Sequence, residues 1–209
     1  MLTHKNIIIL KTSYTNNLIE AGCDEAGRGC LSGAVFAAAV ILPKDFSHSI
    51  LTDSKMLSEK NRNLLKTEIE QTALAYAVGI VSEREIEKIN ILHASILAMH
   101  RALDGLKISP EFIIVDGNKF KKYKTIPHQT VVKGDAKYFS IAAASVLAKT
   151  YRDEYMMKIS KEFPVYNWHK NKGYATKEHR QAIEQHGICK YHRRTFIKSY
   201  NNLKLDFNI

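Results

Sequence analysis

The segment 22–29 limits the possible folds most, because two adjacent carboxylates end an apolar run and a Gly-Arg-Gly turn follows them. Neighbouring side chains of a strand point to opposite faces, so Asp24 and Glu25 cannot chelate one ion as a simple pair from a flat strand. They can flank a site where the strand runs out into a loop. Two close carboxylates in an apolar setting disfavour each other's ionisation. The pattern therefore predicts a positive group beside them, either Arg28, a divalent cation or both, unless the segment is only a polar corner.

Two later apolar runs deliver acidic residues in a similar way. Residues 111–115 are typical of a strand buried on both faces, and Asp116 follows them in a turn before glycine. Residues 129–133 lead to Asp135, at the start of an alanine-rich helix expected at about 136–160. Ligands of open α/β sheets gather beyond the carboxyl ends of strands, which favours a functional site. Turn formation by Asp116 and helix capping by Asp135 explain the same residues equally well.

The remaining apolar runs predict strands and helices in alternation. Strands are expected at 34–42 and 75–81, and helices at about 58–72, 92–106 and 176–186. Leu64, Leu65 and Ile69 form the expected inner face of the first of these helices. The alternation predicts an α/β protein. Residues 1–160 are interpreted as the core, and 161–209 as a basic, aromatic C-terminal helical region.

Size and composition fit one soluble domain. The chain has 209 residues, of which 45% are hydrophobic, and no apolar run is long enough to cross a bilayer. We therefore expect no membrane partner. Cys23, Cys30 and Cys189 are widely spaced and form no Cys-x-x-Cys pattern, which favours buried, reduced thiols in a cytoplasmic protein.

The charge favours a polyanionic partner. The net charge is +10 and the isoelectric point is about 9.4, which suits phosphate contacts with nucleic acid. Cations and aromatic residues alternate at 119–124 and again at 169–194. Cations can hold phosphates while aromatic rings stack on bases or sugars.

The four carboxylates can converge on one point. Asp24, Glu25, Asp116 and Asp135 offer hard oxygen ligands without a His or Cys cluster, which selects Mg²⁺ or Mn²⁺ over zinc. A basic protein with a metal-loaded acidic pocket suggests phosphodiester hydrolysis, in which two ions stabilise the attacking and leaving oxygens.

At this point the motifs resemble those of ribonuclease HII over residues 18–197. The matching segments, in order, are Asp24-Glu25-Ala26-Gly27-Arg28-Gly29, Asp53-Ser54-Lys55, Val115-Asp116-Gly117-Asn118, Lys133-Gly134-Asp135-Ala136-Lys137, and the segments 142–149, 171–176 and 192–196. The resemblance implies an RNase H-like fold with a mixed central β-sheet, in one type-2 domain of about 18–207. It also implies hydrolysis of RNA in RNA–DNA hybrids and incision 5′ of ribonucleotides embedded in duplex DNA, giving 3′-hydroxyl and 5′-phosphate ends.

The same resemblance implies roles for individual residues. Asp24, Glu25, Asp116 and Asp135 fall on the catalytic, metal-binding positions of the family, which favours Asp135 as a ligand. Asp153 is a rival for the fourth ligand, but we expect it to pair with Arg152 or a neighbouring lysine.

Substrate contacts follow from the resemblance as well. Gly27, Arg28 and Gly29 match the turn that meets the ribose 2′-hydroxyl, the group that distinguishes RNA from DNA. Tyr174 matches the tyrosine that stacks under the sugar of the next deoxynucleotide. Lys55 and Lys172 fit phosphate contacts, although a solvated lysine explains each equally well. Cys30 and Ala34 stand where the family commonly has proline, and Cys23 replaces a branched apolar residue; these changes concern packing.

Other possible functions can be distinguished from that of a ribonuclease HII. A non-catalytic nucleic-acid binder explains the charge but not four carboxylates at separate strand ends. A DNA-only nuclease of the same fold would ignore ribose. Ribonuclease HIII carries a further N-terminal domain, for which about 17 residues are too few. We expect a monomer, with Asp206 and Phe207 as a degenerate, weak sliding-clamp motif. No role is assigned to Trp168 or His169.

Overall fold

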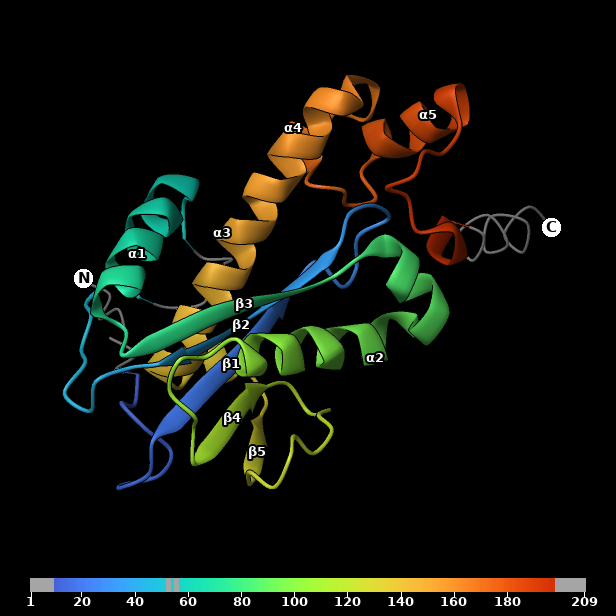
Figure 1. Ribbon diagram of the computed structural model, residues 1–209. Coiled ribbons are helices and arrows are strands. Elements are labelled where there is room, and N and C mark those ends of the chain that lie inside the picture. Colours follow the sequence, from blue (N-terminus) through green and yellow to red (C-terminus); the bar gives the residue numbers. More distant parts are fainter. Residues whose placement is uncertain (1–9, 52–53, 55–56, 198–209) are drawn as a thin grey trace, which may run out of the picture.

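The computed structural model describes residues 10–51, 54 and 57–197. These residues form one five-stranded sheet with helices on both faces (Figure 1). The strands are β1 (Glu20–Ala26), β2 (Val35–Ile41), β3 (Ala75–Val81), β4 (Phe112–Asp116) and β5 (His128–Val131), in the order β3-β2-β1-β4-β5. The helices are α1 (Glu59–Thr72), α2 (Glu83–Asp104), α3 (Phe139–Glu162), α4 (Trp168–Asn171) and α5 (Lys177–His186), with 3₁₀ turns at Gly134–Ala136 and Pro164–Tyr166.

The sheet is mixed, as the resemblance implied. β1 pairs antiparallel with β2 but parallel with β4, and β4 pairs parallel with β5. Three neighbouring strands therefore present their carboxyl ends at one edge of the sheet. This arrangement confirms the predicted α/β fold class and brings the residues that follow β1, β4 and β5 to the same side.

Each face of the sheet has its own core, because side chains alternate along the strands. Ala21 and Cys23 of β1 face α2, whereas the alanines of α3 cover the opposite face. Gly22 lies so close to α3 that an added Cβ would stand 2.3 Å from the carbonyl carbon of Ser140. The small residues of α3 therefore let this helix lie close to the sheet.

Three expectations about helices need correction. Leu64 is 52% exposed, so the inner face of α1 consists of Leu65 and Ile69 only. The helix expected at 92–106 is the second part of α2: non-helical backbone at Asn90 separates it from an earlier part, which begins at a capping box formed by Ser82 and Glu85 and was not predicted. α3 begins only at Phe139, because the chain first makes the 3₁₀ turn Gly134–Ala136. Asp135 lies inside that turn and does not cap α3, so the capping interpretation of Asp135 is wrong.

The last helices lie at the far end of α3 (Figure 1). Together with α3 they enclose a small core that is rich in aromatic side chains. Trp168 is fully buried there and donates its Nε1–H to His179 Nε2 at 3.0 Å. The structure thus gives Trp168 a packing role.

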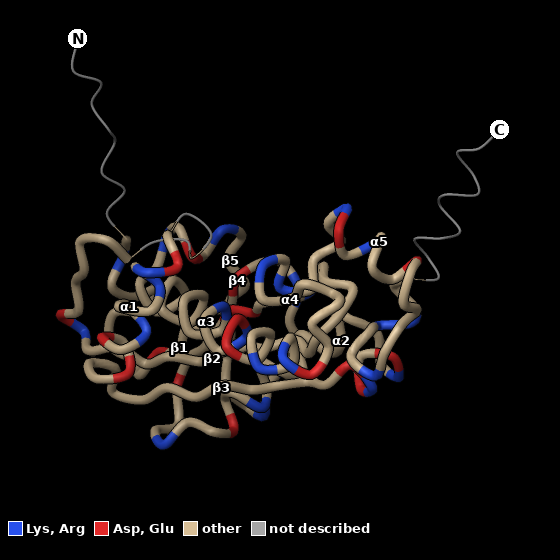
Figure 2. The backbone as a smooth tube through the Cα atoms, turned by 90° about the horizontal axis from the view of Figure 1, so that it is seen from above, with Lys and Arg blue, Asp and Glu red and all other residues tan. Residues whose placement is uncertain are grey.

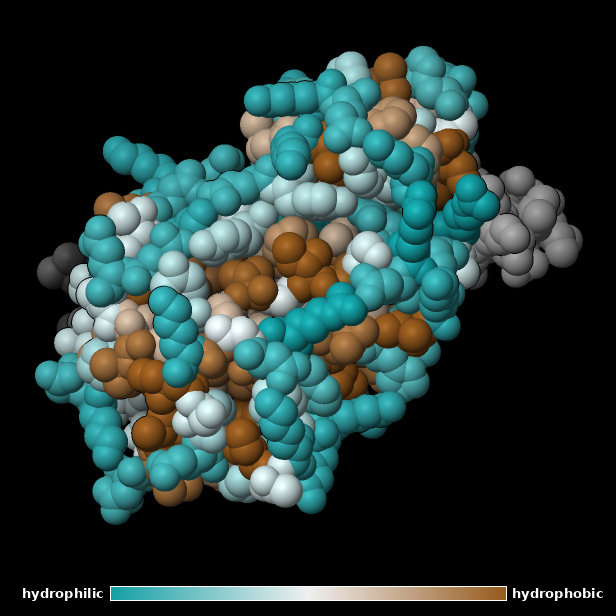
Figure 3. Space-filling model, viewed as in Figure 1, coloured by the Kyte–Doolittle hydropathy of each residue, from teal (hydrophilic) through white to brown (hydrophobic). Residues whose placement is uncertain are grey.

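In the described part of the chain, no helix is long and apolar enough to span a membrane. The face in Figure 3 is largely hydrophilic, with hydrophobic side chains exposed in smaller patches.

Candidate active site at the carboxyl ends of three parallel strands

Asp24 and Asp116 lie side by side on adjacent parallel strands. The register pairs Cys23 of β1 with Val115 of β4, so the next residue of each strand is a carboxylate. Adjacent strands are about 4.8 Å apart, which places both side chains within reach of one site. Asp24 is only 5% exposed and points toward α3, where Ser145 forms a side-chain hydrogen bond with it.

Asp135 follows the next strand of the same edge. The backbone N–H of Gly134 donates to Asp116 Oδ1 at 2.7 Å. This bond ties the buried turn that carries Asp135 to the end of β4. The parallel order β1-β4-β5 therefore brings three of the predicted acidic positions to one edge of the sheet, although Asp24 precedes Asp116 by 92 positions in the sequence.

The carboxylates of the site repel one another, and nearby cations do not fully offset their negative charge. Burial raises the pKa of Asp24 well above its usual range, and the charges of Glu25 and Asp116 raise it further. Arg28 pairs with Glu25 at 3.0 Å, as one of the predicted compensating groups. Its side chain is 52% exposed, so the ion pair is screened by solvent and contributes little to stability.

The donor set fits a hard divalent cation. A cation would remove the repulsion that raises the Asp24 pKa, and all the candidate ligands are carboxylate oxygens. Among the described residues, no group of three or more His, Cys, Asp or Glu side chains is already arranged to hold a metal ion. Like charges oppose a closer approach of these carboxylates. The metal-ligand assignment of the four residues stays a prediction.

A cavity of about 220 Å³ adjoins the carboxylates. Its walls come from β1, the turn after β1, α3 and the loop before α5. The lining residues are Asp24, Glu25, Ala26, Gly27, Arg28, Gly29, Ser54, Ser145, Lys149 and Tyr174. Tyr174 lies about 150 positions after the glycine turn, and the structure brings both to one cavity, where Tyr174 is 43% exposed.

Three polar residues that line the cavity were not predicted as site residues. Ser54 Oγ and Ser145 Oγ are 2.9 Å apart, and Ser145 in turn reaches Asp24. Lys149 stands one helical turn after Ser145 on α3 and lines the same cavity. All three lie within the matching motifs, which was the available signal. Serine and lysine have no ligand chemistry that would have singled them out.

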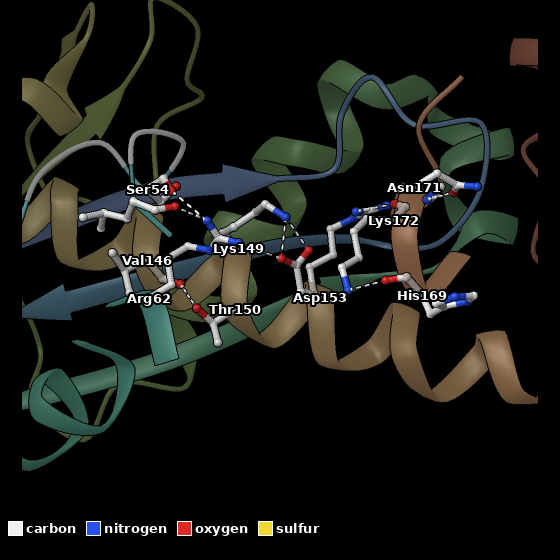
Figure 4. Close-up of polar contacts among 12 residues, drawn as sticks. Ser54, Arg62, Val146, Lys149, Thr150, Asp153, His169, Asn171 and Lys172 are labelled. Carbon is white, nitrogen blue, oxygen red and sulfur yellow. Dashed lines mark hydrogen bonds and ion pairs between the residues drawn. The ribbon is translucent and has the colours of Figure 1, made fainter. Parts of the chain in front are cut away.

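Lys149 also forms an ion pair with Asp153. Figure 4 shows Lys149 and Asp153 joined one turn apart on α3, and Arg62 Nη2 lies 3.6 Å from Asp153 Oδ2. The expected lysine partner is thus confirmed, whereas Arg152 is directed elsewhere. Burial lowers the pKa of Lys149, and Asp153 partly restores it. Asp153 does not line the cavity, so its charge is used to hold Lys149 and Arg62.

The structure says little about the two lysines that were predicted to contact phosphate. Lys172 Nζ donates to the carbonyl of His169 at 2.8 Å, in a segment beside α3 (Figure 4). Lys55 lies outside the described residues, as do Asp206 and Phe207.

The cysteines are free thiols, as predicted, and Cys23 and Cys30 are buried. Burial raises the pKa of Cys23, with a further contribution from Asp24.

The comparisons with known proteins agree with one another. A sequence profile described as ribonuclease HII matches residues 21–199. The ribonuclease HII of Bacteroides fragilis is 68% identical over 179 residues, covering 86% of this chain and 89% of that protein. The ribonuclease HII of Bacteroides thetaiotaomicron is 64% identical over 196 residues, covering 93% and 98%. The structure of a PCNA:RNase HII complex from Archaeoglobus fulgidus matches with a TM-score of 0.71 at 25% identity, covering 84% and 94%. The predicted family and the RNase H-like fold are confirmed.

Proposed function

Because the chain belongs to the ribonuclease HII family, we propose that it incises duplex DNA on the 5′ side of embedded ribonucleotides, as well as hydrolysing the RNA strand of RNA–DNA hybrids. The products carry 3′-hydroxyl and 5′-phosphate ends. The family places the protein among metal-dependent endonucleases that act on RNA–DNA hybrids. Incision at an embedded ribonucleotide and catalysis by two metal ions are proposed in addition to this family activity.

The acidic edge of the sheet is the proposed metal site. Asp24, Glu25, Asp116 and Asp135 would hold Mg²⁺ or Mn²⁺, since they are hard oxygen donors in a region of excess negative charge. When bound, two such ions supply an activated water and stabilisation of the leaving 3′-oxygen. The chain itself holds the carboxylates in register through β1 and β4 and anchors Asp116 on the Gly134 N–H.

Substrate recognition is proposed for the other wall of the cavity. The main chain of Gly27, Arg28 and Gly29 would meet the ribose 2′-hydroxyl, because glycine allows close approach. Tyr174 would stack under the sugar of the next deoxynucleotide, and Lys55 and Lys172 would contact phosphates. The observation that carries this proposal is the single cavity shared by the carboxylates, the glycine turn and Tyr174.

The proposed setting is a cytoplasmic monomer. Residues 1–160 would form the catalytic core and 161–209 the C-terminal helical part that binds substrate. The Archaeoglobus fulgidus relative was solved in complex with PCNA. A weak sliding-clamp contact through Asp206 and Phe207 is the corresponding proposal here.

Cleavage of a duplex that contains one ribonucleotide tests the proposed function. We expect a cut on the 5′ side of the ribonucleotide, only with Mg²⁺ or Mn²⁺, and no cut in the all-DNA duplex. Asp116→Asn should abolish turnover while binding is kept or strengthened. Binding without cleavage by the wild-type protein would indicate a non-catalytic binder, and cleavage of the all-DNA duplex would indicate a DNA nuclease; either result would refute the proposal.

A further inference from the structure

A fully buried guanidinium lies between the two loops that the proposed function assigns to substrate. Arg152 of α3 is 0% exposed. Its Nε donates to the carbonyl of Ala34 at 3.2 Å, Nη2 to Ser32 at 3.1 Å and Nη1 to Lys172 at 2.9 Å. These partners are main-chain carbonyls and not carboxylates. A buried charge that is held by main-chain carbonyls is a costly way to stabilise a fold, which indicates that Arg152 serves the geometry of these loops.

The glycine turn rests directly on this guanidinium. A Cβ added to Gly27 would lie 2.0 Å from Arg152 Nε, and Gly27 has φ +96°. A side chain at this position would therefore both strain the backbone and collide with Arg152. The Arg152 side chain therefore fills the space behind the turn, and the turn can pack against it only with a glycine at position 27.

The Tyr174 loop meets the same region from the other side. The N–H of Leu31 donates to the carbonyl of Gly173 at 2.9 Å. A Cβ added to Gly173 would lie 2.6 Å from the carbonyl oxygen of Ser32. The loop 27–34 and the Tyr174 loop are therefore in close contact, and Arg152 donates to Ser32 and Ala34 of the first loop and to Lys172 of the second. The loop that contains Asn171 and Lys172 runs beside the α3 side chains in Figure 4.

We propose that Arg152 is a positioning residue that sets the spacing between the Gly27-Arg28-Gly29 turn and Tyr174. The inference rests on the proposed function, in which the turn meets a ribose and Tyr174 meets the sugar of the next deoxynucleotide. A fixed spacing between these two contacts corresponds to one nucleotide step. Arg152 thereby favours cleavage at a ribonucleotide that is followed by a deoxynucleotide over cleavage within continuous RNA.

The variant Arg152→Lys tests this role, because lysine keeps the charge but cannot reproduce the planar fork that bridges the two loops. We would measure kcat and KM on a duplex with one ribonucleotide and on a continuous RNA–DNA hybrid, with the cut positions mapped. The kcat/KM on the single-ribonucleotide duplex, divided by that on the continuous hybrid, should fall by about 10-fold or more. A misplacement of about 1 Å lowers the rate by up to about 10²-fold. An equal decline on both substrates, or an unchanged ratio, would overturn the inference.

Arg193→Lys is the matched control. Arg193 is also 0% exposed and donates to the carbonyls of Gly33 and Arg28, which belong to the glycine-turn side. It should change the kcat/KM of both substrates together and leave their ratio within about 2-fold. If Arg193→Lys shifts the ratio as much as Arg152→Lys, the effect is a general one of buried arginines and the inference fails.

Gly173→Ala provides a second route that keeps Arg152 in place. Its methyl group should push the Tyr174 loop away from Ser32 and lower the same ratio. Denaturant unfolding would establish that each variant is folded, and Gly173→Ala decides the matter if Arg152→Lys is not. Failure of the wild-type protein to cut either substrate would refute the proposed function itself, which is a different result from an unchanged ratio.

Discussion

At the scale of single residues, the buried carboxylate of Asp24 is proposed to serve activity but lowers the stability of the fold. Its carboxylate is buried and lies near the charges of Glu25 and Asp116, so its pKa is raised. A carboxyl group with a raised pKa holds its proton more tightly in the folded state. Ionisation of Asp24 therefore costs free energy in the folded state, and its contribution to stability is lost as the pH rises through the folded pKa.

Asp24→Asn should for this reason stabilise the metal-free protein at pH 7 while it removes activity. We expect a melting temperature that is several degrees higher, since about 1 kcal/mol corresponds to about 2–4 °C in a chain of this size. Turnover should fall by about 10³-fold or more, as is usual for a catalytic side chain. Calorimetric melting and a cleavage assay measure the two effects. A variant that melts lower, or that retains wild-type turnover, would contradict this account of Asp24.

At the scale of elements, the contact between β1 and α3 determines the position of the acidic edge. Gly22→Ala would drive a methyl group into the main chain of α3, 2.3 Å from the carbonyl carbon of Ser140. Overpacking of a tight core costs about 1–3 kcal/mol, and more where main chain must move. We expect a melting temperature at least about 3 °C lower. Gly29→Ala is the control for stability, because nothing lies within 4 Å of its added Cβ; equal melting of both variants would disprove the tight contact.

The helices at the end of α3 make a separate prediction about pH. Burial lowers the pKa of His179, and burial with the nearby His179 lowers that of His192 to about 3. The bonding agrees, since His192 Nδ1 accepts from the Cys189 N–H at 3.0 Å and His179 Nε2 accepts from Trp168. Charging either ring would place a proton against another donor. Between about pH 3 and 6.5 the unfolded state binds more protons, so the free energy of unfolding should rise with pH across this window.

Denaturant unfolding at several pH values between about 4 and 6 measures this slope, which is at most about 1.4 kcal/mol per pH unit for each histidine. His192→Asn should flatten it, because the asparagine does not titrate. His186 is exposed, so His186→Asn should leave the slope as it is in the wild-type protein. A wild-type slope that survives in His192→Asn would show that other groups cause the acid sensitivity.

The elements also show what sequence could and could not predict. The strand at 75–81 and the helix from Ser58 to Thr72 follow the prediction, since an apolar run and a helix cap are local properties of the sequence. The start of α3 was placed too early, because a 3₁₀ turn and a helix share the same local residue preferences. Acidic strand ends indicated the site, whereas the role of Arg152 depends on carbonyls about 120 and 20 positions away and has no local signature.

At the scale of the whole molecule, a chain of positive net charge has acidic segments near its centre. Figure 2 shows acidic segments near the middle of the molecule, close to α3 and β4, with basic segments on several sides. The net charge of +10 should make affinity for a duplex depend strongly on salt, because each phosphate contact releases counter-ions.

The affinity of the inactive Asp116→Asn protein for a single-ribonucleotide duplex should fall by about 10²-fold between about 50 and 200 mM salt if about four phosphates are contacted. Fluorescence anisotropy measures this directly. Substitution of Lys172 by Met should reduce the slope by about one contact. Affinity that is independent of salt would contradict an electrostatic mode of binding.

Calorimetric titration with Mn²⁺ tests most directly whether the acidic strand ends form one metal site. The wild-type protein should bind Mn²⁺, and Asp24→Asn, Glu25→Gln, Asp116→Asn and Asp135→Asn should each weaken that binding by about 10-fold or more. Asp153→Asn, a buried carboxylate of α3 outside the cavity, should bind Mn²⁺ as the wild-type protein does. Wild-type Mn²⁺ affinity in the folded variants of Asp24 and Asp116, or its loss in Asp153→Asn alone, would contradict the account.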